Sequence, residues 1–134
     1  MVFMGNVTIL AVDDNEAIRS LLVETLESLG YKVIVAASGQ EALEICRAKK
    51  EKIELLLADV VMPGMSGRQL TKKLQAVRPD LKVLLMSGYP ADIVGPNSQL
   101  EPHLNFISKP FRQDVLSQKI NQILKESSAD TDEE

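Results

Sequence analysis

The fold of this 134-residue chain is decided by the stretch Val7-Thr8-Ile9-Leu10-Ala11-Val12-Asp13-Asp14, a mostly apolar run that stops at two adjacent carboxylates. Four more runs of similar length follow, at residues 32–36, 53–58, 82–86 and 104–108. Near-continuous apolar runs bounded by polar or turn residues are typical of strands that are covered on both faces. The sequence therefore predicts five buried strands.

Between the runs, apolar residues recur at the three- and four-residue spacing of amphipathic helices. They are Ile18, Leu21, Leu22, Leu26 and Leu29, then Leu70, Leu74 and Val77, and finally Val115, Leu116, Ile120, Ile123 and Leu124. Two helices are predicted to begin with capping boxes, at Ser38-Gly39-Gln40-Glu41 and Ser66-Gly67-Arg68-Gln69. Alternating strands and amphipathic helices indicate helices packed on a parallel sheet.

The positions of the polar residues agree with one particular winding of the sheet. Because crossovers are right-handed and helices must cover both faces, we expect a single doubly wound α/β domain of five strand–helix units with strand order 2-1-3-4-5. That order opens a crevice between strands one and three, where Asp13, Asp14 and Asp59 end their strands. Ser87 and Lys109 follow strands four and five, so we expect them at the same edge.

The fourth helix departs from this regular pattern. Its segment, residues 90–102, contains Gly95-Pro96 at the centre. Because proline removes a helical hydrogen bond and glycine favours turns, this helix is expected to be short or irregular.

Composition and charge exclude several classes of function. Hydrophobic residues make up 45% of the chain and aromatic residues 4%, so the core should be aliphatic. The formal net charge is −4, but residues 126–134 hold five acids and no base, so the remainder carries +1. No cluster of Lys and Arg suggests a nucleic-acid groove. We expect a domain over residues 6–125 and an acidic tail over 126–134 that is disordered or a truncated linker.

Nothing in the sequence indicates a membrane span or a disulfide. The apolar runs are shorter than the ~18 residues that a span requires, and the first residues are too few for a signal peptide. We therefore expect no direct membrane contact and a cytoplasmic location, either free or as the cytoplasmic part of a membrane-bound kinase. The single cysteine, Cys46, is expected to be buried on an apolar helix face.

The carboxylates at the predicted edge indicate a divalent cation site. Burying carboxylates together without a counter-charge costs several kcal/mol. Mg²⁺ prefers oxygen ligands and is commonly held by one or two carboxylates together with a phosphate. Asp14 and Asp59 could bind it directly, Asp13 through water, and the backbone carbonyl of Val61 could add an oxygen.

A carboxylate can also be a nucleophile that attacks a phosphoryl group. Phosphoryl transfer requires mainly positioning and neutralisation of the charged oxygens. Asp59 is the candidate nucleophile, with the Lys109 ammonium and the Ser87 hydroxyl contacting phosphoryl oxygens.

These motifs resemble the receiver domains of two-component response regulators, which have a flavodoxin-like fold. The matching features are Asp13-Asp14, the segment Asp59-Val-Val-Met-Pro-Gly-Met-Ser-Gly67, Ser87-Gly88 and Lys109-Pro110-Phe111. The resemblance implies that Asp59 accepts a phosphoryl group, with Mg²⁺, from a histidine kinase or a histidine phosphotransfer domain. It also implies that Ser87 and Lys109 contact that group, that Phe106 changes rotamer as a switch with Ser87, and that the bond before Pro110 is cis.

The resemblance places two further side chains beside the water that hydrolyses the phosphorylated state. They are Val61, two residues after Asp59, and Tyr89, two residues after Ser87. Val61 cannot hydrogen-bond a water and Tyr89 is bulky enough to obstruct one. Slow self-hydrolysis is therefore predicted.

Three other functions remain as alternatives. A flavin- or nucleotide-binding domain should carry a glycine-rich phosphate loop after the first strand, where this chain has two acids. An aspartate-nucleophile phosphatase resembles a pattern with a second acid two residues after the nucleophile, where this chain has Val61. A degenerate receiver that only binds proteins would lack part of the acid, hydroxyl and lysine set.

The resemblance also bears on the parent protein. No output domain follows residue 125, and the stretch Met86-Ser-Gly-Tyr89 with the acidic tail resembles receivers of hybrid sensor histidine kinases. That origin is preferred over a free-standing regulator. A monomer or a weak dimer is expected.

Overall fold

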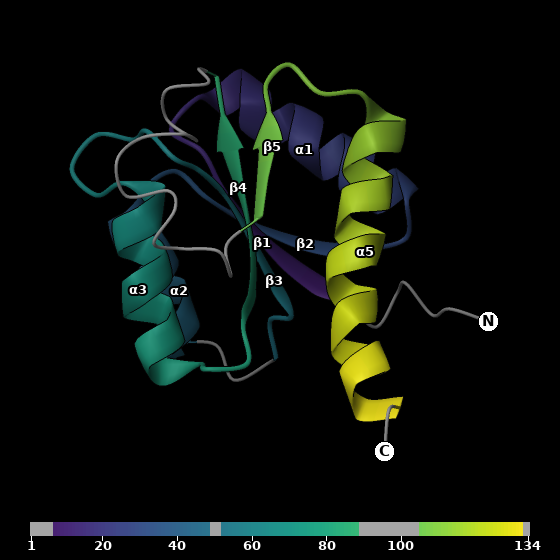
Figure 1. The fold of residues 1–134 in the computed structure, drawn as a ribbon. Helices are drawn as coiled ribbons and strands as arrows, with labels where there is room; N and C mark the ends of the chain where they lie inside the picture. Colours follow the sequence, from purple (N-terminus) through teal and green to yellow (C-terminus); the bar gives the residue numbers. More distant parts are fainter. Residues whose placement is uncertain (1–6, 49–51, 89–104, 133–134) are drawn as a thin grey trace.

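The predicted parallel sheet is present in the computed structural model, which describes residues 7–48, 52–88 and 105–132 (Figure 1). Its strands run in the order β2-β1-β3-β4-β5, and every neighbouring pair is parallel. They are β1 (Thr8–Val12), β2 (Lys32–Ala36), β3 (Leu55–Asp59), β4 (Lys82–Ser87) and β5 (Asn105–Ser108). The predicted strand order is therefore confirmed.

In the described part of the chain, two pairs of helices cover the two faces of this sheet. In Figure 1, α2 and α3 lie together on one side and α5 lies on the other. The helices are α1 (Glu16–Ser28), α2 (Gly39–Ala48), α3 (Gly67–Val77) and α5 (Gln113–Asp132). Alternate strand residues belong to two separate aliphatic clusters. Leu10 and Leu56 pack with α2 and α3, whereas Ile9 and Leu57 pack with α1 and α5. The doubly wound arrangement thus follows from the two-residue period of the strands.

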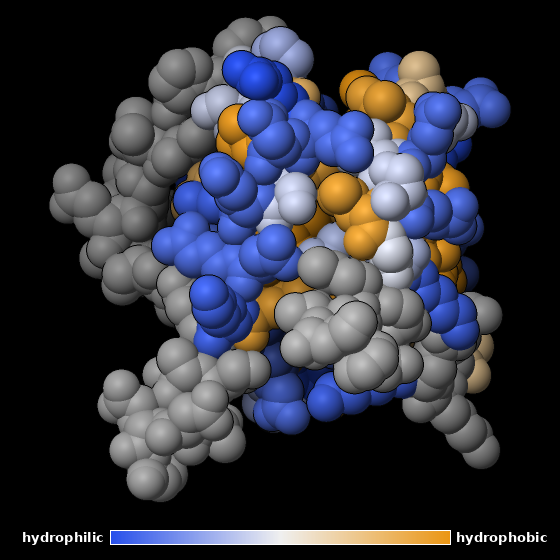
Figure 2. Space-filling view, turned by 90° about the vertical axis from the view of Figure 1, so that its right-hand side faces the viewer, coloured by the Kyte–Doolittle hydropathy of each residue, from blue (hydrophilic) through white to orange (hydrophobic). Residues whose placement is uncertain are grey.

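The edge strand β2 and three helix residues are less buried than the sequence suggested. Leu21, Val77 and Val115 were expected in apolar helix stripes, but they are 50%, 69% and 43% exposed. Each helical residue is rotated by about 100° from the next, so Leu21 and Val115 point away when their neighbours Leu22 and Leu116 are buried. Figure 2, which shows the α5 side, accordingly mixes hydrophilic and hydrophobic residues.

Of the two predicted capping boxes, the one at the start of α3 is complete, and the one at the start of α2 has only the hydrogen bond of its serine. In α3, Ser66 Oγ accepts from the Gln69 N–H at 3.1 Å, and Gln69 Oε1 accepts from the Ser66 N–H at 2.9 Å. In α2, Ser38 Oγ accepts from the Glu41 N–H at 3.1 Å, but the Glu41 carboxylate accepts from the N–H of Ala37 instead of Ser38. These caps fix where the two helices begin.

Several boundaries differ from the sequence predictions. Strand β3 begins at Leu55, two residues after the expected start, and Asp59 is its last residue. Helix α5 continues to Asp132, although a disordered tail or linker was expected after residue 125. Residues 113–132 contain neither Gly nor Pro, so the sequence has no strong helix terminator there.

Other predictions are confirmed or lie beyond the described ranges. Cys46 is buried, and the Lys109–Pro110 bond is cis. The fourth-helix segment and Tyr89 lie outside the described residues. Among the described residues, no helix is long and apolar enough to cross a membrane.

Candidate functional site

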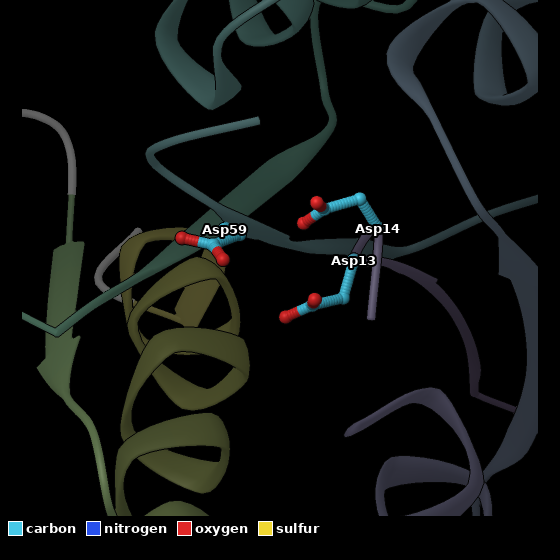
Figure 3. Close-up of side chains that lie close together, drawn as sticks. All are labelled: Asp13, Asp14 and Asp59. Atoms are coloured by element: carbon cyan, nitrogen blue, oxygen red, sulfur yellow. The ribbon is translucent and has the colours of Figure 1, made fainter. Parts of the chain in front are cut away.

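Three carboxylates meet at the carboxyl ends of β1 and β3. Asp13 and Asp14 follow β1 and point toward Asp59 (Figure 3). Each can offer an oxygen such that the three oxygens lie within 4.8 Å of one another. Asp13 and Asp59 are buried, at 1% and 8% exposure, whereas Asp14 is exposed. The sequence prediction that these acids converge is therefore correct.

The acidic loop is held mainly through Asp13. Its N–H donates to the Ala36 carbonyl at 3.2 Å, and its Oδ1 accepts from the N–H of Asn15 at 2.9 Å. Its carbonyl accepts from Arg19 Nη1 at 2.8 Å. Asn15 caps α1, because its side chain accepts from the Ile18 N–H. The first turn of α1 thus fixes the loop that carries both acids.

Lys109 supplies the positive charge of the site. Its ammonium donates to Asp59 Oδ2 at 2.8 Å and to Asp13 Oδ2 at 3.3 Å. Its backbone N–H donates to the Ser87 carbonyl at 2.7 Å, which ties the lysine to the end of β4. Burial alone would lower the pKa of Lys109, but the hydrogen bond to Asp59 and the negative charges of Asp13 and Asp59 outweigh it, so the pKa is raised. The ammonium therefore stays charged between two carboxylates.

The loop after Asp59 depends on two glycines for different reasons. Gly64 has φ of 82°, which side-chain-bearing residues rarely adopt. Gly67 donates its N–H to the Val60 carbonyl at 2.9 Å, and a Cβ at Gly67 would collide with the carbonyl oxygen of Asp59. Conformational freedom is thus needed at Gly64, whereas Gly67 is needed for close packing against the strand end.

Val61 is bonded to Asp59, and Ser87 ends the strand next to β3. The N–H of Val61 donates to Asp59 Oδ1 at 3.1 Å, and the Val61 side chain is 59% exposed. Ser87 is the buried last residue of β4, at 1% exposure. Val61 therefore lies beside the carboxylate cluster, and Ser87 lies at the same edge of the sheet.

Phe106 lies one strand further out, on β5. It is partly buried against the aliphatic cluster beneath α2 and α3. The guanidinium carbon of Arg68, in the first turn of α3, lies 5.3 Å from the centre of its ring, within the range of a cation–π contact. Phe106 thus lies on the strand that leads to Lys109 and contacts the first turn of α3.

Two residues of the site were missed in the sequence. Asn15 stands directly before the acidic first turn of α1, and that N-cap signal could have identified it. Arg19 acts on a backbone carbonyl, which leaves no recognisable sequence pattern. The arrangement combines three carboxylates that could hold a metal ion with an ammonium that is bonded to two of them.

The model of the response regulator receiver domain matches residues 9–121 of this chain. The chain belongs to the response regulator receiver family. It is 37% identical over 121 residues to the sensor kinase CckA of Brucella abortus, covering 90% of this chain but only 13% of that kinase. It is also 37% identical over 116 residues to the receiver protein CpdR of the same organism, covering 87% of this chain and 94% of CpdR.

A solved structure of the family shows the same fold at moderate identity. The response regulator TrrA from Thermotoga maritima, in complex with Mg²⁺ and BeF, is 30% identical, with a TM-score of 0.76. The match covers 87% of this chain and 98% of TrrA. The receiver assignment and the flavodoxin-like fold are confirmed, and the chain is a two-component signalling domain.

Proposed function

We propose that this receiver accepts a phosphoryl group on Asp59 in a reaction that requires Mg²⁺. The observation that carries the proposal is the meeting of three carboxylates, whose oxygens lie within 4.8 Å of one another and two of which, Asp13 and Asp59, accept from the Lys109 ammonium. Burying Asp13 and Asp59 costs desolvation free energy even beside a paired cation, so stability alone does not account for the cluster. Phosphoryl transfer uses each of these groups, because it needs a nucleophile and counter-charges around the phosphoryl oxygens.

The residues fit a magnesium ion. Asp14 and Asp59 would bind it directly, Asp13 through water, and the Val61 carbonyl would add an oxygen, a set of hard oxygen ligands. When bound, Mg²⁺ supplies positive charge that balances the phosphoryl oxygens. The solved Mg²⁺–BeF complex of TrrA supports this assignment.

In the transfer, an oxygen of Asp59 forms a bond to phosphorus while the bond between phosphorus and the donor imidazole nitrogen breaks. The leaving nitrogen keeps the electron pair. Lys109, which donates to Asp59 at 2.8 Å, is placed to pair with a phosphoryl oxygen instead. Ser87 binds another oxygen through its hydroxyl, and Phe106 changes rotamer as Ser87 moves.

The phosphodonor is a histidine kinase or a histidine phosphotransfer domain. We prefer the receiver of a hybrid histidine kinase as the origin of the chain, which the 37% identity to the sensor kinase CckA supports. A free-standing regulator is the second candidate, because the chain is equally identical to CpdR and covers 94% of it.

The test compares the wild type with Asp59→Asn in acetyl phosphate or beryllofluoride, with Mg²⁺ and with EDTA. We expect a mass increase in the wild type alone and only with Mg²⁺, located at residue 59 by peptide mapping after trapping. Metal-dependent shifts of amide resonances should accompany it. A wild type without any metal-dependent change would support the degenerate, protein-binding receiver instead.

The lifetime of the phosphorylated state is a second measurement. Val61 offers an exposed apolar side chain beside Asp59, which cannot position a water for attack. With Tyr89 as the other flanking residue, we propose slow self-hydrolysis. A half-life of seconds in Mg²⁺ would contradict this.

A further inference from the structure

Arg19 is an arginine of α1 that is bonded to the loop carrying the two acids. It lies one helical turn after the Asn15 cap, is half-buried, and donates from Nη1 to the Asp13 carbonyl at 2.8 Å. We propose that Arg19 is a positioning residue for the magnesium site, acting through the backbone of Asp13 and Asp14. This inference rests on the proposed function, since it concerns the same metal.

The argument begins with the exposure of Asp14. Asp13 is 1% exposed and is bonded through its N–H, its carbonyl and both carboxylate oxygens. Asp14 is exposed, so packing does little to fix its direction. Its orientation must therefore be set by the two peptide groups on either side of its Cα.

Both of those peptide groups are held. The peptide before Asp14 carries the Asp13 carbonyl, which Arg19 binds. The peptide after Asp14 carries the Asn15 N–H, which Asp13 Oδ1 binds at 2.9 Å. With both neighbouring peptides fixed, the direction of the Cα–Cβ bond of Asp14 is fixed as well, and the carboxylate that it carries points toward Asp59 (Figure 3). Removing Arg19 releases the first of these peptides.

Two effects of Arg19 on Mg²⁺ have opposite signs. As a positioning group it strengthens binding, because outer partners that orient metal ligands are commonly worth about 10- to 100-fold in affinity. As a positive charge near the site it weakens binding of a cation. The sign of the change on removing Arg19 therefore distinguishes positioning from electrostatics.

The experiment titrates MgCl₂ into the full chain and follows amide resonances by NMR, since the chain has no tryptophan for fluorescence. The variants are Arg19→Met, which removes the charge and the bond, and Arg19→Lys, which keeps the charge and can still donate. The control is Arg47→Met, which removes the same charge from the last turn of α2, the helix end remote from the acids. Thermal unfolding of each variant checks folding, and Arg19→Gln replaces the methionine variant if that one does not fold.

We expect the dissociation constant of Mg²⁺ to rise about 10-fold in Arg19→Met. It should return part of the way to the wild-type value in Arg19→Lys and change little in Arg47→Met. If folded Arg19→Met binds Mg²⁺ with an unchanged or lower dissociation constant, the inference is overturned and the proposed function remains intact. A wild type that does not bind Mg²⁺ overturns the proposed function and the inference together.

Discussion

At the scale of single residues, position relative to the strand ends could be predicted from the sequence. Asp13, Asp59 and Ser87 each end an apolar run, and the carboxyl ends of parallel strands share one edge, so their convergence follows from topology alone. The contacts of Arg19 could not be predicted, because a backbone carbonyl accepts from any donor within reach. The role of Gly67 in close packing could not be predicted either, because it became clear only from the collision that a Cβ at this position would cause.

Lys109 gives the residue-scale prediction. Lys109→Met should lower the free energy of unfolding by about 1–3 kcal/mol at pH 7 in EDTA, because it leaves the buried Asp13 and Asp59 without their cation. The pKa of Lys109 is raised in the folded state above the ordinary value of 10.5 for a lysine. Its stabilisation is therefore fully present below that value and is lost as the pH rises through the folded-state pKa.

Urea unfolding from pH 7 to 11 measures this effect. The difference in unfolding free energy between wild type and Lys109→Met should be constant up to about pH 10 and narrow above it. Taking the difference removes the titration of the other lysines and tyrosines, which both proteins share. A difference that grows at high pH would show that the ion pair does not stabilise the fold.

At the scale of elements, the packing of the start of α3 against the end of β3 is the contact on which the site depends. Gly67 lies against the Asp59 carbonyl and the Leu85 side chain. Gly67→Ala should destabilise the fold by about 1–3 kcal/mol, since backbone cannot give way as a flexible side chain does. It should also weaken Mg²⁺ binding, because Asp59 is displaced.

Gly88→Ala is the matched control for stability. A Cβ there meets nothing within 4 Å among the atoms that the structure describes, so its unfolding midpoint in urea should stay close to that of the wild type. Equal losses in the two variants would mean that the contact with Asp59 is not the cause of the destabilisation, because a Gly→Ala change without a collision should not destabilise the fold.

Elements were also predicted with uneven success. Five strands and their order follow from apolar runs and right-handed crossovers, and both are correct. Burial along the helices was less predictable: Val77 continues the spacing of Leu70 and Leu74 but lies in the last turn of α3 and is 69% exposed. Periodicity indicates which helix face is apolar, but not how far the sheet beneath it extends.

At the scale of the whole molecule, we expect that the acidic end can be removed without loss of the core. The buried side chains of α5 through residue 125 are Leu116, Ile120 and Ile123. A chain ending at Lys125 should therefore keep its melting temperature within a few degrees, although α5 continues to Asp132. Its formal charge changes from −4 to +1, because five acids and no base are removed.

Calorimetry of the full and shortened chains checks this boundary. The measurement should be made at two salt concentrations, because salt screens the charge of the acidic end without affecting buried contacts. A drop of more than about 8 °C, beyond the shift of about 2–8 °C that a loss of 1 kcal/mol causes in domains of about 60–250 residues, would place residues 126–132 within the folding unit.

The position of Lys109 in the sheet order has one more consequence. Strand β4 lies between β3 and β5, so β3 and β5 share no backbone ladder. The lysine ammonium nevertheless reaches from the end of β5 to Asp59 on β3 and acts as a non-covalent cross-link over the intervening strand. We expect a group added to Asp59 to enter that cross-link, so that its length affects the separation of the two strand ends. Chemistry on β3 should then displace the end of β5, together with the end of β4, to which the Lys109 N–H is bonded.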